Sequence, residues 1–114
     1  MIKILSVILL SLVTSHYALA GAGSGNGTIT QFYINSSGTL ARVQFSQPTA
    51  NPDGCTKDAF YLVDLSEGNG SSRFAAALLT AYTTKNTVSF WVSGCVDAAF
   101  WGGTYPKLND IYMK

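Results

Sequence analysis

Two cysteines about 40 residues apart constrain this chain more than any other feature. Cys55 and Cys95 are its only cysteines. A strand-like run, residues 60–63, follows the first, and a second one, residues 88–92, leads to the other. In an exported chain two such cysteines form one disulfide. In the chain-entropy model a loop of about 40 residues closed in this way stabilises a domain by roughly 4 kcal/mol. The bond would join strand, helix and strand into one unit.

The first 20 residues indicate a signal peptide. Lys3 precedes an apolar run, residues 4–13, that is too short to span a bilayer. Ala18 and Ala20 form a small-residue cleavage signature, so we expect cleavage after Ala20. The mature chain, residues 21–114, is then long enough for one small domain in a secreted or periplasmic protein.

The charges of the mature chain balance. Seven basic residues, of which Lys3 belongs to the signal peptide, stand against six acidic ones. No basic run is present, so the electrostatic footprint of a nucleic-acid or anionic-membrane binder is missing. We therefore expect no nucleic-acid partner and no stable insertion into a membrane.

Alternation and turn residues predict five strands and one helix. Residues 21–27 are glycine-rich and read as a mobile arm or the lead-in to the first strand, and the aromatic segment 96–105 reads as a loop. The expected strands are 28–34, 40–45, 59–64, 87–93 and 107–113, with a helix over 71–83.

The expected helix has two different faces. Ser71 or Ser72 can cap its start. An apolar face carries Phe74, Ala77, Leu78, Ala81 and Tyr82. The opposite face is small and almost uncharged, which would let another backbone approach closely, so it is a candidate oligomer surface; it carries Ser72, Ala76, Thr80 and Thr83.

The order strand, strand, strand, helix, strand, strand is the layout of the OB-fold, a small Greek-key barrel. The disulfide Cys55–Cys95 would tie the lead-in of the third strand to the end of the fourth. An open α+β sandwich is the alternative.

Catalysis finds little support in the residues. The only histidine, His16, leaves with the signal peptide, and no serine lies in a G-x-S-x-G context. Asp64 and Glu67 are the one conceivable carboxylate pair, and a Gly/Asn turn makes them solvated turn residues. Two thiolates are too few to hold a metal. We expect no enzyme activity, no cofactor and no metal; a small hydrolase is the third class considered.

Aromatic residues favour a binding function. Trp91 lies on the more polar face of a strand, and Phe100, Trp101 and Tyr105 lie in a glycine-bearing segment. Rings exposed among Ser, Thr and Asn side chains suit sugars, whose C–H faces stack while their hydroxyls find hydrogen bonds. The alternative is that each ring closes the core.

Short motifs along the mature chain resemble one family, the B subunit of subtilase cytotoxin with the related pertussis-like toxin B subunits. The motifs are Ile29-Thr30-Gln31-Phe32, Pro52 to Cys55, Leu78 to Tyr82, Ser93-Gly94-Cys95 and Tyr105-Pro106-Lys107.

This resemblance implies an OB-fold, a homo-pentameric ring with the helices facing a central pore, a toxin A subunit as partner, and binding of sialylated host glycans. In the family a serine just before the first strand takes part in sugar binding; here that place falls at Gly25, with Ser24 adjacent. The candidate glycan contacts are Ser24, Trp91, Trp101 and Tyr105. The alternative function is a stand-alone secreted or periplasmic protein-binding or inhibitory module without a sugar site.

Overall fold

The computed structural model describes residues 20–66 and 70–114. The expected signal peptide up to residue 19, and Glu67 of the conceivable carboxylate pair, lie outside these ranges. The elements are β1 Ala22–Gly23, β2 Ile29–Ile34, β3 Leu40–Phe45, β4 Tyr61–Asp64, α1 Ser71–Thr84, β5 Val88–Ala98, the 3-10 turn η1 Ala99–Trp101 and β6 Gly103–Met113.

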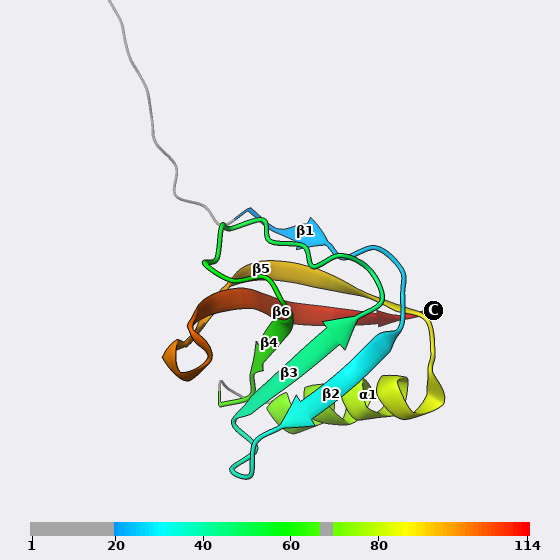
Figure 1. Ribbon diagram of the computed structural model, residues 1–114. Helices are drawn as coiled ribbons and strands as arrows, with labels where there is room; N and C mark the ends of the chain where they lie inside the picture. Colours follow the sequence, from blue (N-terminus) through cyan, green and yellow to red (C-terminus); the bar gives the residue numbers. More distant parts are fainter. Residues whose placement is uncertain (1–19, 67–69) are drawn as a thin grey trace, which may run out of the picture.

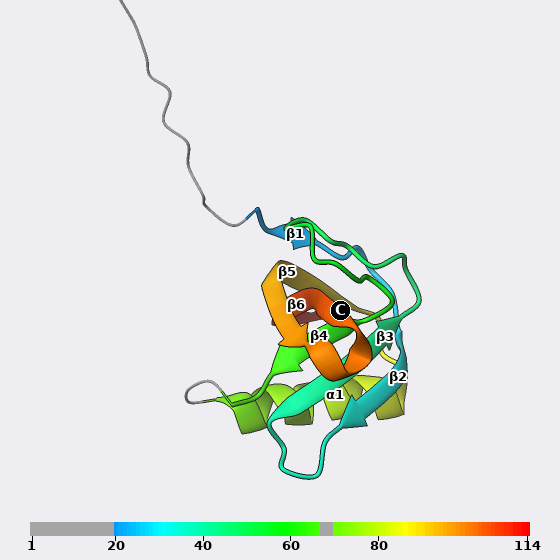
Figure 2. The same cartoon turned by 60° about the vertical axis from the view of Figure 1, so that its left-hand side comes forward.

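The strands form one sheet in the order β1-β5-β6-β4-β3-β2 (Figure 1). Neighbouring strands are antiparallel except β4 and β6, which run parallel with Leu62 opposite Lys107. An additional bridge joins Gly27, just before β2, to Val88 at the start of β5. The two ends of the strand order therefore meet, and the sheet curves round on itself. The helix α1 lies along its lower side in both views, in contact with β2 and β6 (Figures 1 and 2).

The prediction of a mainly β chain with one helix and a Cys55–Cys95 disulfide is confirmed. The two Cα atoms are 5.8 Å apart, within the usual range for a disulfide. Cys95 lies within β5, however, and not at the end of a strand. There are also six strands among the described residues instead of five. The additional one, β1, belongs to the glycine-rich arm and pairs through its main chain with Val92 and Trp91.

The prediction of a loop over residues 96–105 is wrong. The strand β5 continues to Ala98 and β6 begins at Gly103, so only η1 and Gly102 connect them. Glycines caused the error. Gly94, with φ 85°, lies at an irregularity inside β5, where the register shifts between Val92 and Cys95. Glycine in a strand often marks such a bulge.

The predicted cap of the helix is also wrong. Gly70, with φ 95°, is the N-cap residue, and no side chain bonds to the free amides of the first turn. Ser71 and Ser72 are therefore the first helical residues. A left-handed residue before the helix suits glycine, which has no Cβ to clash.

The main core lies between the sheet and α1. The predicted inward residues Leu78 and Ala81 of the helix are buried, and so is the inward face of β5 at Val88, Phe90 and Val92. Other core members are Ile29, Ala41, Val43, Tyr61, Val63, Leu65 and Leu108. This packing leaves the opposite sides of β3 and β4 to be covered by something else.

One polar group reaches into the core. The hydroxyl of Tyr61 accepts a hydrogen bond of 2.7 Å from the backbone N–H of Ala50. Burial raises the pKa of Tyr61, and the hydrogen bond from Ala50 lowers it by a smaller amount. The neutral phenol therefore belongs to the folded state.

Candidate functional site

A second, smaller cluster covers the outside of β3 and β4. Along β4, alternate residues face opposite sides, so Tyr61 and Val63 enter the main core while Phe60 and Leu62 pack outward. The β5–β6 hairpin supplies Ala98 and Tyr105 to this second cluster. We call the surface around it the outer aromatic face, made of Tyr33, Arg42, Phe60, Phe100, Trp101 and Tyr105.

Arg42 lies at the centre of the outer aromatic face. Its guanidinium carbon is 4.8 Å from the centre of the Phe60 ring, 5.0 Å from that of Trp101 and 5.6 Å from that of Tyr33. Each distance is short enough for a cation–π interaction. Four parts of the chain meet here: β2, β3, the segment before β4, and η1.

The rings also pack on one another. Phe60 stacks on Tyr105 with 4.3 Å between ring centres, and Trp101 meets Phe60 edge-on at 5.5 Å and Tyr33 at 5.6 Å. Phe100 leans against Trp101 at 4.8 Å. The hydroxyl of Tyr105 donates to the carbonyl oxygen of Trp101 at 2.5 Å, which holds η1 in place. The face is therefore preformed.

The charge of Arg42 has no acidic partner in the part of the chain that the structure describes. Its Nη2 donates to Oε1 of Gln31 at 3.3 Å, and its Nε is buried without a hydrogen-bond partner. An unpaired cation held among rings attracts a carboxylate or the oxygen atoms of a polar ligand. This arrangement gives the face a positive centre.

The rim of the outer aromatic face is open to solvent. Phe100 is 70% exposed and Tyr33 is 39% exposed, while Trp101 is half-buried between them. Exposed rings offer stacking surface for the C–H face of a sugar, and the guanidinium offers hydrogen bonds to its oxygens. The arrangement can bind; it holds no nucleophile paired with a base.

The structure brings two of the four predicted glycan contacts together. Trp101 and Tyr105 both belong to the outer aromatic face. Tyr105 is only 4% exposed, so its ring supports the face from beneath. Trp101 is the predicted residue that a ligand could touch there.

The other two predicted contacts lie elsewhere. Trp91 is on the outside of β5, opposite Asp110 of β6, and its ring lies so close to Gly21 that an added Cβ would come within 2.1 Å of it. Ser24 is buried: its hydroxyl accepts the Phe90 N–H and donates to the Gly25 carbonyl, each at 2.8 Å. Ser24 thus closes the sheet beside β5.

Sequence reasoning missed Arg42, Tyr33 and Phe60 as site residues. Arg42 was assigned to the polar side of a half-buried strand. The register of β3 in the sheet would have pointed to Arg42, because this residue lies between Tyr33 on β2 and Leu62 on β4. A lone basic residue flanked across the sheet by an aromatic and an aliphatic residue is placed for a cation–π contact.

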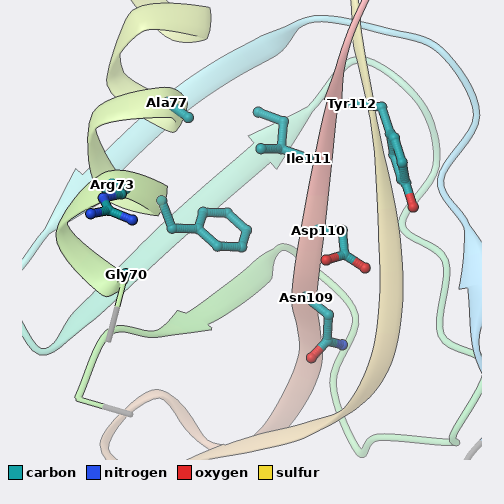
Figure 3. A pocket seen from close by; sticks show the side chains of 8 residues that line it. Gly70, Arg73, Ala77, Asn109, Asp110, Ile111 and Tyr112 are labelled. Carbon is teal, nitrogen blue, oxygen red and sulfur yellow. The ribbon is translucent and has the colours of Figure 1, made fainter. Parts of the chain in front are cut away.

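A groove between α1 and β6 is the second notable surface. It has a volume of about 450 Å³. The helix contributes one wall and the last third of β6 the other (Figure 3). Its lining residues are Gly70, Arg73, Phe74, Ala77, Asn109, Asp110, Ile111 and Tyr112.

The predicted oligomer surface of the helix is exposed throughout; it comprises Ser72, Ala76, Thr80 and Thr83. Thr83 turns its hydroxyl back to the carbonyls of Leu79 and Thr80. Asp64, the described member of the conceivable carboxylate pair, accepts the backbone N–H of Ser66 at 2.9 Å and its hydroxyl at 2.5 Å. This contact fits a turn residue.

No helix within residues 20–66 and 70–114 is long and apolar enough to cross a membrane. Over the same ranges no three His, Cys, Asp or Glu side chains gather in a way that could hold a metal ion. Comparison with family models, with curated proteins and with solved structures finds no match to this chain.

Proposed function

We propose that this chain is an exported binding domain that recognises a glycan through the outer aromatic face. The observation that carries the proposal is the guanidinium of Arg42, held within 6 Å of three ring centres and without an acidic partner among the described residues. Around it, Tyr33 and Phe100 present open ring surface. Stacking together with a few convergent polar groups is the usual chemistry of a sugar site.

The strand order supports an OB-fold assignment, which is part of this proposal. Without β1, the order is that of a five-strand barrel with a helix between the third and fourth strands and a parallel third and fifth strand. OB-folds bind ligands on the face of strands two and three and on the loops that join strands one to two and four to five. Here these parts are β3, β4, the β2–β3 turn and η1. The outer aromatic face takes Arg42 from β3, Phe60 from the segment before β4, and Phe100 and Trp101 from η1, so it overlaps with these parts.

Export and assembly complete the proposal. A disulfide is typical of proteins in an oxidising compartment, which suits a secreted or periplasmic chain cleaved after Ala20. The resemblance to subtilase cytotoxin and pertussis-like B subunits adds a homo-pentamer and a toxin A subunit as partners. The exposed small face of α1, Ser72, Ala76, Thr80 and Thr83, is the surface on which such subunits would approach one another.

A glycan array followed by calorimetry tests the sugar site. The oxidised mature chain is labelled, screened, and titrated with the glycan that gives the strongest signal. Phe100→Ala and Tyr33→Ala each remove an exposed ring, and we expect each to weaken binding about tenfold, close to 1.4 kcal/mol. Trp91→Ala is the matched control, because it removes an exposed ring from the outside of β5, apart from the outer aromatic face, and should leave affinity unchanged.

Two outcomes would contradict this assignment. If Trp91→Ala abolishes binding while Phe100→Ala does not, the sugar site lies on the outside of β5. If the wild-type chain binds no glycan on the array, the carbohydrate function fails. The alternative of a protein-binding module would then stand, and the groove between α1 and β6 is the observation that favours it.

A further inference from the structure

The last part of β6 has an open main-chain edge. On one side β5 pairs with it, with Phe90 opposite Ile111 and Val88 opposite Met113. On the other side the parallel strand β4 is in register only where Leu62 faces Lys107. Beyond Asp110, no strand within the described ranges pairs with this side of β6. An unpaired edge is a template for another strand.

The hydrogen bonds of β5 identify the free groups. Val88 exchanges two backbone bonds with Gly27, of 2.8 and 2.9 Å, and Phe90 bonds to Ser24 in the same direction. Both residues therefore point their main-chain groups away from β6. In an antiparallel pair, opposite residues that do not bond each other point outward on both strands. Ile111 and Met113 consequently direct N–H and C=O toward the open side.

The groove lies along this edge. Residues Asn109 to Tyr112 of β6 line one side of it, and Gly70, Arg73 and Ala77 at the start of the helix line the other. In Figure 3 the side chain of Ile111 projects toward the helix, whereas Asp110 and Tyr112 project to the other side of β6. A volume of about 450 Å³ falls in the usual range for a ligand site.

We propose that this groove binds an extended peptide segment, which pairs as an additional strand with Ile111 and Met113 and places an acidic side chain beside Arg73. A peptide is the ligand that supplies N–H and C=O groups at the spacing of a strand, about 3.3 Å per residue. The segment would continue the sheet where β4 leaves it.

The positive charge of Arg73 is the reason for expecting an acidic side chain in the bound peptide. Arg73 stands on the helix wall, exposed, and forms no ion pair with any described residue. The carboxylate of Asp110 belongs to the opposite side of β6, where it faces Trp91 across the strands. Between the two walls, Phe74, Ala77 and Ile111 leave apolar surface for a side chain that points inward. This inference does not depend on the sugar site, which lies over β3 and β4.

A designed probe tests the binding mode directly. The probe is a fluorescein-labelled heptapeptide, Thr-Val-Thr-Glu-Thr-Val-Thr with a blocked carboxyl end, whose valine and glutamate side chains all point to the same side of the strand. We expect saturable binding by fluorescence anisotropy. Methylation of every second backbone nitrogen, first on one edge of the peptide and then on the other, should weaken binding about tenfold for one of the two edges only. Replacing glutamate by glutamine should weaken it as well.

A pair of matched variants locates the site. Ala77→Phe places a ring in the groove and should lower the affinity for the probe at least about tenfold. Leu79→Phe adds a ring at an exposed position of the helix that belongs neither to the groove nor to the proposed oligomer surface, and it should change nothing. Arg73→Glu should lower the affinity for the glutamate peptide and raise it for the same peptide with lysine in place of glutamate.

Hydrogen exchange supplies a readout that a general effect on folding would not reproduce. In the free protein the amides of Ile111 and Met113 should exchange quickly, while that of Tyr112, which faces β5, should be protected. Saturation with the probe should slow exchange at Ile111, at Met113 or at both, and leave Tyr112 as it was.

Several outcomes would overturn the inference. These are no binding at millimolar probe, equal binding of both methylated peptides, or equal affinities of Ala77→Phe and Leu79→Phe. Light scattering could give a further outcome that contradicts the inference. If the wild-type chain self-associates and Ala77→Phe alone makes it monomeric, the groove is an interface between copies of this chain and not a peptide site.

Discussion

The outer aromatic face and the α1–β6 groove differ in what fills them. In the first, side chains from four segments pack around Arg42, and only the outer rim of rings remains open. In the second, the main chain of β6 ends its pairing early and leaves space beside the helix. The first surface is specified by residue types and the second by topology. Substitutions should therefore disturb the face strongly and the free groove weakly.

The largest effect is expected from a change that belongs to neither region. The bond between Cys55 and Cys95 ties the segment before β4 to β5, and β5 supports both the hairpin and the strand that borders the groove. Replacing both cysteines by serine should lower the free energy of unfolding by about 4 kcal/mol. Urea denaturation followed by circular dichroism measures it. A loss below about 1 kcal/mol would mean that the bond adds little constraint to the unfolded chain.

The next effect separates the two regions by one pair of matched substitutions. Arg42→Ala removes three cation–π contacts together with packing and should cost about 2 kcal/mol. Arg73→Ala, on the groove wall, should cost less than about 0.5 kcal/mol, as exposed sites usually do. Both are measured by urea denaturation. Equal losses would show that the rings do not hold Arg42.

A conservative variant sharpens the same comparison. Arg42→Lys keeps the charge but not the planar group that lies over several rings at once, so about half of the Arg42→Ala loss should remain. If lysine restores full stability, charge alone accounts for the interaction.

The smallest effect concerns pH. Because burial raises the pKa of Tyr61 above its value in the unfolded chain, its contribution to stability is complete below about pH 10 and is lost as the pH rises through the folded-state pKa. Stability should therefore fall as the pH rises above about 10. Tyr61→Phe should show a shallower fall over that range in denaturation experiments. An unchanged slope in this variant would assign the dependence to other groups.

The sequence predicted elements whose pattern is local. The strand β3 was predicted with its observed bounds, because Ala41, Val43 and Phe45 alternate with polar residues. The helix was predicted to within one residue at its end, because its apolar face repeats at helical spacing without glycine or proline. The β5–β6 hairpin was shortened, since the strand was ended at residue 93, before the bulge at Gly94, and Gly102 and Gly103 were assigned to a loop.

Neither the outer aromatic face nor the groove between α1 and β6 could be predicted from local sequence patterns, and the reasons differ. The outer aromatic face unites Tyr33, Arg42, Phe60 and Trp101, which come from segments far apart in the chain, so the pairing of strands had to be known first. Trp101 was found because aromatic residues gather near it in the sequence. The groove depends on main-chain groups, which every sequence has, and on the point where β4 stops pairing with β6. No residue type marks such a point.

The hydrogen bonds between Ser24 and Phe90, which close the sheet beside β5, have a consequence for how this protein folds. These residues bond across 66 positions, so the first strand of the chain cannot be completed until β5 has been made. The ribosome releases most of the sequence before the sheet can close. Pairings between distant segments slow folding, because the entropy cost of closing a long loop arises before the stabilising contacts form. We therefore expect a slow folder, whose sheet closes only after β5 has been synthesised.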